Sequence, residues 1–192
     1  MELKKMNIED FKNQMYDEYT KLFPEDEQRD WEDIEKSYYD GVEILYGIIE
    51  NEKNVGFIML EKLNEDYPYY IDFFAIFEKY QGNNYGTMAL EYLIKNIIKD
   101  TPLCLEIEKE TEKDINTIRR AKFYRNLGFK KINSEYLFFG VRYTPYVYDM
   151  QNRLEKSKVD TIMLNYYKNN CGFESIINNF ILVYLIYKKI RI

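Results

Sequence analysis

The stretch of this sequence that most directly suggests binding chemistry is the turn Gln81-Gly82-Asn83-Asn84-Tyr85-Gly86-Thr87. It lies between an aromatic and aliphatic run at 69–77 and a helical pattern at 85–99. The order strand, turn, helix points backbone N–H groups and the positive end of the helix dipole at one place just beyond the end of the strand. Gly82 and Gly86 let a ligand come close to the backbone. The turn therefore predicts a phosphate or pyrophosphate site, with an ordinary strand-to-helix loop as the alternative.

The composition limits what chemistry the other residues can supply. The 192 residues contain no histidine, which excludes a Ser-His-Asp arrangement, a Cys-His pair and a histidine-bearing zinc site. Two cysteines, Cys104 and Cys171, are too few for a disulfide framework or a four-thiolate metal site, and we expect both to be reduced. Acid and base roles therefore fall to carboxylates, tyrosines, backbone groups and water, and no metal is expected.

The charge balance indicates the kind of partner. A net charge of -6 and a pI near 5.0 argue against nucleic acid, because binding to phosphates needs clustered Lys and Arg. A cationic small molecule is the more natural ligand. Residues 1–10 are charged and lack the apolar core of a signal peptide. No apolar run approaches the ~20 residues that cross a bilayer as a helix, so we expect a cytoplasmic protein with no membrane partner.

Hydrophobic periodicity predicts the elements that position these residues. We expect helices at 7–22, from 31 to about 39, at 85–99 and from Asp114 or Asn116 to Leu127, and strands at 1–5, 42–50, 54–63, 69–77, 103–108, 129–131 and 136–142. The strands at 42–50 and 54–63 read as a hairpin. This order predicts a mixed α/β sheet with helices on both faces.

The chain changes character after about residue 144. We expect a domain at 1–150 and a C-terminal extension at 151–192. The extension contains a helical pattern at 159–167 and an apolar stretch at 176–192. This stretch would pack on the domain or on a second subunit, which would make a homodimer, or it would form a frayed tail.

The turn and a later helix together resemble the GNAT superfamily of acetyl-CoA-dependent N-acetyltransferases. The family's signature, Arg/Gln-x-x-Gly-x-Gly/Ala, places Gln81 first, Asn84 where the first glycine usually stands, and Gly86 last. The asparagine is a departure, but asparagine tolerates a left-handed backbone better than most residues. The segment ending Phe123-Tyr124-Arg125-Asn126-Leu127-Gly128-Phe129 is similar to the family's Phe-Tyr-x-x-Leu-Gly-Phe pattern.

The resemblance covers roughly residues 1–147 and implies a fold and a cofactor. The fold would be GNAT-like, with a mixed, mostly antiparallel central sheet of about six to seven strands, helices on both faces and an extra C-terminal segment. Acetyl-CoA would be the co-substrate. The residues that would hold its pyrophosphate through their backbone are Gln81, Gly82, Asn83, Asn84, Tyr85, Gly86 and Thr87. The backbone of Phe74, Ala75 and Ile76 would bind the pantetheine amides.

The resemblance also implies catalytic roles. Tyr124 would protonate the leaving thiolate, because a phenol with a pKa near ~10 can donate to a thiolate whose conjugate acid has a pKa of ~8.5. Asp72 is the first candidate for the general base. An acid among aromatic residues is costly to bury unless it faces a cleft or is paired. Glu106 and Glu108 are its rivals, with a solvated or ion-paired strand face as the alternative.

The implied reaction is direct attack of a primary amine on acetyl-CoA in a ternary complex. The acceptor would be a small-molecule or peptide amine: a polyamine, an aminoglycoside, an amino acid and a protein amine fit equally. The alternative is a non-catalytic acyl-CoA-binding module that acts through protein interactions. A dinucleotide-binding domain is disfavoured, because the glycine spacing differs and the turn follows several strands instead of the first.

Overall fold

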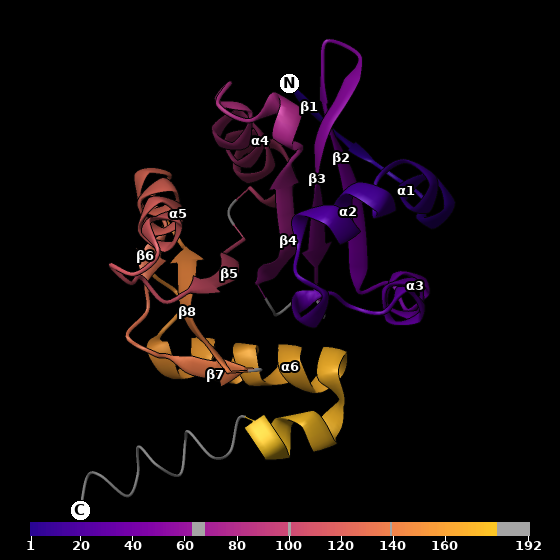
Figure 1. The fold of residues 1–192 in the computed structure, drawn as a ribbon. Coiled ribbons are helices and arrows are strands. Elements are labelled where there is room, and N and C mark those ends of the chain that lie inside the picture. The colour runs from indigo at the N-terminus through magenta and orange to yellow at the C-terminus, as the bar shows by residue number, and fades with distance from the viewer. Residues whose placement is uncertain (63–67, 100, 139, 180–192) are drawn as a thin grey trace, which may run out of the picture. The chain divides into compact units, whose positions relative to one another are not determined.

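A computed structural model describes residues 1–62, 68–99, 101–138 and 140–179 (Figure 1). The chain divides into two compact units, Met1–Cys104 and Leu105–Ile192.

The sheet of the first unit is built from four antiparallel strands in chain order: β1 (Glu2–Lys5), β2 (Glu43–Glu50), β3 (Lys53–Glu61) and β4 (Tyr69–Ile76). The predicted hairpin of β2 and β3 is present, and Asn51 and Glu52 turn it with φ values of 48° and 64°. Positive φ at two central residues matches the twist of paired strands. The start of β5 (Leu103–Glu108) runs parallel to β4 through the pairs Tyr69–Leu103 and Tyr70–Cys104.

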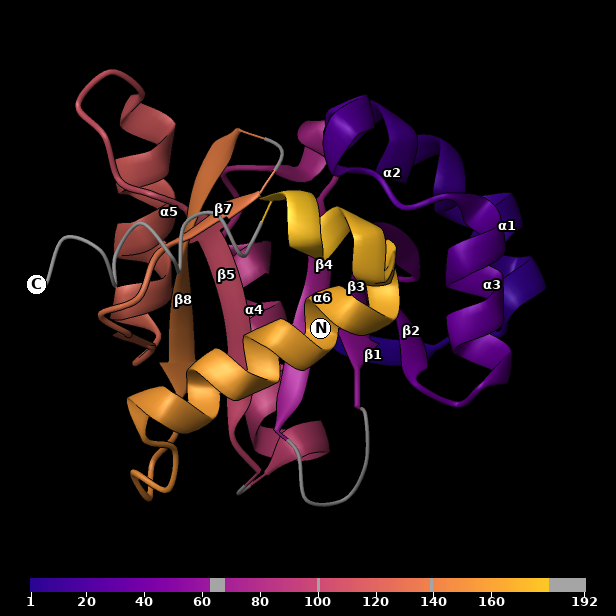
Figure 2. The same ribbon diagram turned by 90° about the horizontal axis from the view of Figure 1, so that it is seen from below.

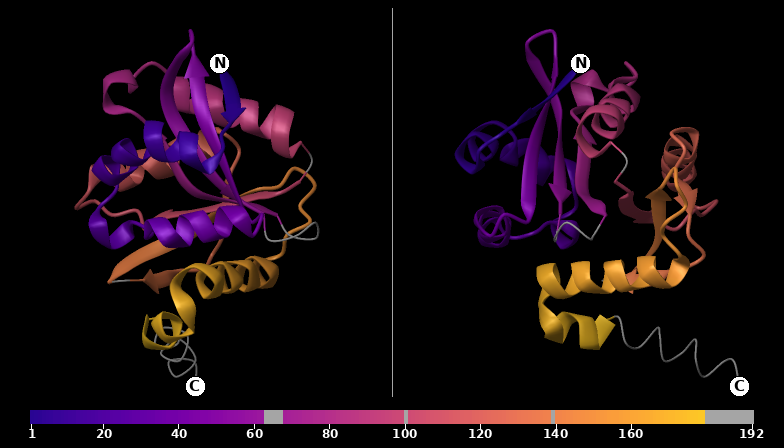
Figure 3. Two further views of the ribbon diagram at one scale, coloured as in Figure 1. Left: turned by 90° about the vertical axis from the view of Figure 1, so that its right-hand side faces the viewer. Right: turned by 180° about the vertical axis from the view of Figure 1, so that it is seen from behind.

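Helices cover both faces of these strands. One face carries α1 (Ile8–Gln14), α2 (Tyr16–Leu22), the short 3-10 helix η1 (Glu25–Glu27) and α3 (Trp31–Tyr39). The other face carries α4 (Tyr85–Tyr92) and its π-helical continuation η3 (Leu93–Ile98), as Figures 1 and 3 show. A second 3-10 helix, η2 (Glu78–Tyr80), follows β4. The expected single helix at 7–22 is instead two helices that meet at Met15, whose φ of -122° departs from helical geometry.

The core of the first unit lies between the first three helices and the sheet. Alternate residues of the strands point to this side, because successive side chains in a strand face opposite ways. The buried cluster comprises Met6, Ile8, Phe11, Met15, Tyr19, Ile34, Leu45, Phe57, Met59, Phe73 and Phe77. Asn7 caps α1 as expected, since its Oδ1 accepts a hydrogen bond from the Asp10 N–H at 2.7 Å.

The second unit contains the rest of β5, α5 (Ile115–Asn126), β6 (Lys130–Lys131), β7 (Tyr136–Phe138), β8 (Val141–Tyr148) and α6 (Lys156–Asn179). In it β8 neighbours β5 and pairs antiparallel with β6 and β7. Figure 2 shows the first turns of α6 in front of β8 and β5.

The prediction of one strand at 136–142 is wrong. The chain reverses near Gly140, whose φ is 81°, and β8 continues to Tyr148 through Pro145. Proline has no N–H to give to a strand ladder. Its carbonyl still accepts a hydrogen bond from the Ile132 N–H at 3.0 Å, so the strand persists where the sequence suggested that the sheet had ended.

The expected fold class is confirmed. The described residues form a mixed, mostly antiparallel sheet of eight strands, against the six to seven expected, with helices on both faces of the first unit's strands. The predicted helix at 159–167 is part of the longer α6, while 180–192, most of the apolar stretch, lies outside the described residues. Among the described helices, none combines the length and the hydropathy that crossing a membrane requires.

Candidate active site

The predicted anion-binding turn links β4 to α4 through two residues with positive φ. Gly82 has a φ of 80°, and an added Cβ there would meet nothing within 4 Å. Asn84 adopts the left-handed conformation, with φ 62° and ψ 10°, and is the N-cap position of α4. This is the residue that stands where the family signature has glycine. Asparagine is enriched among the non-glycine residues that take this conformation, so the local backbone is that of a glycine turn.

The polar side chains of the turn fold back on the turn itself. Gln81 Nε2 donates to the Ile76 carbonyl at 3.0 Å, and Asn83 Nδ2 donates to the carbonyls of Tyr80 and Gln81 at 3.0 and 3.2 Å. The first hydrogen bond of the helix runs from the Met88 N–H to the Asn84 carbonyl at 3.1 Å.

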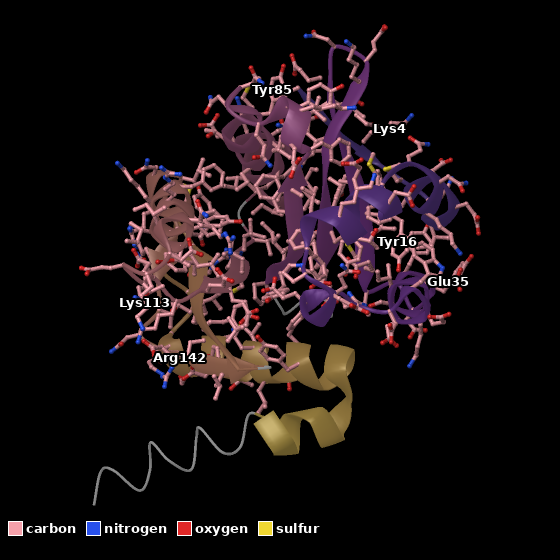
Figure 4. The ribbon with its side chains drawn as sticks, viewed as in Figure 1. Lys4, Tyr16, Glu35, Tyr85, Lys113 and Arg142 are labelled. Atoms are coloured by element: carbon pink, nitrogen blue, oxygen red, sulfur yellow. The ribbon has the colours of Figure 1, made fainter. Side chains whose placement is uncertain are left out.

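The N–H groups of Tyr85, Gly86 and Thr87 precede that bond and therefore stand at the positive end of the helix. Figure 4 labels Tyr85 at this end of α4. The first turn of α4 has no acidic side chain to oppose an anion.

The last residues of β4 lie between this turn and β3. Ala75 and Ile76 pair with Phe57 and Gly56 of β3, so β3 holds one edge of this backbone segment. The parallel ladder with β5 comprises two pairs near the start of β4 and ends at Tyr70. The backbone at Phe74, Ala75 and Ile76 is therefore fixed from the β3 side.

Gly56 is the residue whose substitution tests this packing. A Cβ at Gly56 would lie 2.2 Å from the Ala75 carbonyl oxygen and 3.0 Å from the Ile76 Cα, both backbone atoms. Because backbone cannot rotate away, Gly56→Ala is expected to push β4 from β3 and lower stability by about 1–3 kcal/mol. It is also expected to weaken the acetyl-CoA binding that the sequence predicts for this backbone. Urea unfolding and calorimetric titration measure the two effects.

Gly47→Ala on β2 is the matched control. Its added Cβ would meet the side-chain ends of Met6 at 3.0 Å and Met15 at 3.2 Å, which can move. If Gly56→Ala behaves like Gly47→Ala in both measurements, then the backbone of β4 is not held as tightly as we describe.

Asp72 of β4 is buried in an ion-pair cluster. Its Oδ2 lies 2.6 Å from Arg29 Nη1, which also contacts Glu43 Oε2 at 2.7 Å and Glu61 Oε1 at 3.1 Å. The side chains are 9% exposed for Arg29 and 3% or less for the three acids. The sequence predicts that an acid at this position either faces a cleft or has a partner. In the structure Asp72 has a partner, Arg29.

The segment before α3 holds Arg29 in place. The Arg29 N–H donates to the Tyr19 hydroxyl at 2.7 Å, and Arg29 Nη2 donates to the Asp33 carbonyl at 3.2 Å. The preceding Gln28 donates from Nε2 to the carbonyls of Thr20 and Phe23 at 3.0 and 2.6 Å. The backbone N–H and the guanidinium of Arg29 therefore both form hydrogen bonds to residues of α2 and α3.

Three buried acids contact the Arg29 guanidinium, and their proximity to one another has an electrostatic consequence. Oxygens of Glu43, Glu61 and Asp72 lie within 4.8 Å of one another, the spacing of a metal-ligand group, and Arg29 Nη1 contacts all three carboxylates. Burial and the nearby Asp72 charge raise the pKa of Glu43 to about 8, with Arg29 opposing. Glu43 therefore keeps its proton at neutral pH, which lowers the charge of the cluster.

Tyr124 lies in the second unit, on α5. The residue is 7% exposed, and its ring makes edge contacts with Phe123 and Phe129 at centroid distances of 5.1 and 5.5 Å. The helix ends where Gly128 takes a φ of 90°. Burial raises the pKa of the Tyr124 hydroxyl to about 12, with Arg120 opposing. The hydroxyl thus stays protonated throughout the physiological range, and it is a weaker acid than an exposed phenol.

The two rival acids on β5 have different surroundings. Glu108 forms an exposed ion pair with Arg120 at 3.3 Å, as the alternative of an ion-paired strand face predicts. Glu106 Oε1 instead accepts a hydrogen bond from the hydroxyl of Tyr167, a residue of α6 that is 2% exposed. Glu106 and Tyr124 both belong to the second unit, whereas the turn, the β4 backbone and Asp72 belong to the first.

Sequence reasoning missed Arg29, Glu43, Glu61 and Tyr167. The sequence pattern did contain a signal for two of them. Glu43 lies two residues from Leu45 on β2, and Glu61 lies two residues from Met59 on β3. Residues two apart in a strand face the same side, so both acids lie on the core-facing side of their strands. An acid in such a position requires a partner. Nothing in the local sequence indicates that Arg29 is that partner, or that Tyr167 meets Glu106.

Solved structures similar to this one define the class of the fold. A GNAT-family acetyltransferase structure from Bacteroides thetaiotaomicron aligns with a TM-score of 0.75 at 23% identity, covering 90% of this chain and 99% of that one. A variant of spermidine N-acetyltransferase from Vibrio cholerae gives 0.58 at 14% identity, covering 82% and 99%. NAA60 of Arabidopsis thaliana in complex with acetyl-CoA gives 0.58 at 11%, covering 78% and 98%.

The fold is thus that of the GNAT acetyltransferases. The model of the acetyltransferase (GNAT) family matches residues 12–129, more than half of the sequence, and the chain belongs to this family. The match includes the turn, Asp72, Glu106 and Tyr124, and it ends before α6. No curated protein matches the sequence significantly.

Proposed function

We propose that this chain transfers an acetyl group from acetyl-CoA to a primary amine by direct attack in a ternary complex. The observation that carries the proposal is the turn between β4 and α4. It combines left-handed Gly82 and Asn84 with three N–H groups at the start of a helix that lacks acidic residues in its first turn. Such a turn suits the pyrophosphate of coenzyme A.

The proposed binding mode uses backbone groups of the first unit. The N–H groups at 82–87 hold the pyrophosphate, with Gln81 and Asn83 shaping the turn through their hydrogen bonds to carbonyls. The backbone of Phe74, Ala75 and Ile76 hydrogen-bonds the pantetheine amides. These contacts place the thioester carbonyl for attack by the amine.

The proposed chemistry has two proton transfers. The amine nitrogen attacks the thioester carbon, a carboxylate accepts its proton directly or through water, and the C–S bond of the tetrahedral intermediate breaks. Tyr124 then gives its hydroxyl proton to the departing thiolate. The two products are the acetylated amine and coenzyme A with a free thiol.

Glu106 is the stronger candidate for the carboxylate that accepts the amine proton. The Asp72 side chain is held by Arg29 at 2.6 Å and is 3% exposed, so a proton or a water could reach its carboxylate only if that pair opened. Glu106, by contrast, accepts a hydrogen bond from the Tyr167 hydroxyl, which is a neutral partner. Asp72 then has a role in holding β4 and the Arg29 segment.

The acceptor is proposed to be a cationic amine, because the chain carries a net charge of -6. The similar Vibrio cholerae structure is of a spermidine N-acetyltransferase, which makes spermidine a suitable first substrate. We place the protein in the cytoplasm, with no metal requirement.

Coenzyme binding followed by thiol release tests the proposal. Millimolar acetyl-CoA is expected to raise Tm by several degrees through mass action. Free thiol should then appear when spermidine, an aminoglycoside, an amino acid or a peptide amine is added. The absence of any coenzyme binding at millimolar concentration would refute the proposal.

A non-catalytic acyl-CoA-binding module is the second candidate, because Asp72, one of the three acids named for the base, is engaged in an ion pair with Arg29. Such a module would bind acetyl-CoA and release no thiol with any amine of the panel. Hydrolysis without acceptor is the control, because slow thioester hydrolysis by itself would mimic turnover.

A further inference from the structure

The charge of the chain is divided unequally between its two units. Acidic residues outnumber basic residues about two to one in Met1–Cys104, whereas basic residues are in the majority in Leu105–Ile192. The net charge of -6 is therefore the balance of an acidic unit and a basic unit. Two copies of the chain can attract each other through unlike units, although each copy as a whole is acidic.

The exposed side of α3, in the acidic unit, carries Glu32, Glu35 and Tyr39, which we call the acidic stripe; Figure 4 labels Glu35. Their spacing of three and four residues places them on one face of the helix. Glu32 is exposed, Glu35 is partly exposed, and Tyr39 is 69% exposed. Within the described ranges, neither glutamate side chain forms an ion pair or a hydrogen bond. The acidic stripe therefore presents two unpaired carboxylates beside one aromatic ring.

The exposed side of α5, in the basic unit, carries Ile115, Arg119 and Lys122, which we call the basic stripe. Their spacing of four and three residues again places them on one helix face, while Ala121 and Tyr124 on another face are buried. Ile115 is 53% exposed, and both basic residues are exposed. Neither basic side chain pairs with an acid in the part of the chain that the structure describes.

The two stripes have the same spacing in opposite chain directions. The acidic stripe runs acid, acid, aromatic, and the basic stripe read backwards runs base, base, aliphatic, at the same intervals of three and four residues. Because each residue advances about 1.5 Å along a helix axis, two antiparallel helices bring the stripes into register. The facing pairs are Glu32 with Lys122, Glu35 with Arg119, and Tyr39 with Ile115.

We propose that the acidic stripe of one copy binds the basic stripe of a second copy of this chain in an antiparallel contact. The two ion pairs set the direction and the register, and the tyrosine and the isoleucine bury apolar surface beside them. The contact is small and charged, so the association is weak and depends on salt. Made twice around a two-fold axis it closes a dimer, and made once per copy it extends a chain of copies.

Sedimentation of the full chain at several concentrations tests the proposal. In about 50 mM salt the weight-average mass is expected to rise above the monomer mass of 23.5 kDa as the protein concentration increases. In about 1 M salt it should return to the monomer value, because the ion pairs are screened. A chain that stays monomeric at millimolar concentration in low salt would overturn the proposal.

Two charge reversals test the pairing directly. Arg119→Glu and Glu35→Arg should each lower the association constant by about tenfold or more in low salt, because each places like charges opposite one another. An equimolar mixture of the two variants should associate as the wild type does, since each variant keeps the stripe that the other has lost. Both positions lie on helix surfaces, and circular dichroism and Tm check that the variants are folded.

Glu91→Arg is the matched control, because it makes the same change of charge at an exposed position of α4. Its association constant should stay within about twofold of the wild type. If Glu91→Arg weakens association as much as Glu35→Arg does, then total charge drives the association and the stripes do not. A mixture of the two stripe variants that remains monomeric while the wild type associates would also overturn the pairing. None of these results depends on acetyl transfer.

Discussion

Tyr124→Phe is expected to lower kcat by about 10²–10⁴-fold, the range of a lost general acid, and to leave acetyl-CoA affinity within about twofold. The ring contacts with Phe123 and Phe129 persist in phenylalanine, so only the hydroxyl is lost. Steady-state kinetics with the best amine of the panel and calorimetric titration of acetyl-CoA measure the two quantities.

The pH dependence adds a second test of Tyr124. Burial raises the pKa of its hydroxyl to about 12, so the proton stays on the oxygen up to at least about pH 10. Loss of activity between pH 8 and pH 10 should therefore not come from Tyr124, and the wild type and Tyr124→Phe should share any alkaline limb in that range.

Tyr148→Phe is the matched control for Tyr124. Tyr148 belongs to the same aromatic group, with its ring centroid 5.6 Å from that of Phe129, and has no assigned role. It should retain wild-type kcat. Equal losses in the two variants would mean that Tyr124 acts through packing, and full activity of Tyr124→Phe would remove it from the mechanism.

Arg29→Met is expected to lower the free energy of unfolding by about 3–5 kcal/mol at neutral pH, as removal of one partner from a buried ion pair does. Glu43, Glu61 and Asp72 would lose their shared guanidinium in a site where their side chains are 3% or less exposed. Because the acids can take up protons instead, the loss should shrink as the pH falls. Urea unfolding between pH 5 and pH 8.5 measures it.

The same cluster predicts how the wild-type stability depends on pH. The pKa of Glu43 is about 8 in the folded chain, above its ordinary value of 4.5. The folded state therefore holds a proton that the unfolded state releases. The contribution of this proton to the free energy of unfolding is complete below about pH 4.5 and is lost as the pH rises towards 8. Glu43→Gln, which copies the neutral form, should flatten this slope and exceed the wild type in stability near pH 8.

An exposed ion pair is the control for Arg29. Lys21 pairs with Glu18 at 3.2 Å with side chains 67% and 37% exposed, and Lys21→Met should cost less than about 1 kcal/mol. If Arg29→Met lowers the free energy of unfolding no more than Lys21→Met does, then the cluster is better solvated than its burial indicates. Asp72 would then again be a candidate for the base.

The sequence by itself determined the features that depend on neighbouring residues. The strand, the turn and the helix around Asn84 follow from local patterns, because a left-handed asparagine and a helix start are properties of a few consecutive residues. The same holds for Asn7, which caps α1, and for β5, whose bounds were predicted correctly. Pro145 misled the prediction, because a strand ladder can tolerate a missing N–H when the carbonyl is still paired.

Only the tertiary structure decided which charged groups meet. Arg29 reaches Glu43, Glu61 and Asp72 across 14, 32 and 43 residues of chain, and Tyr167 reaches Glu106 across 61. Such pairs form because strands and helices pack with particular faces together, and no local pattern records that arrangement. The sequence therefore put Asp72 first and Glu106 among its rivals, with no sign of the partner that each one meets. Their partners, a buried arginine and a helical tyrosine, give them different chemistry.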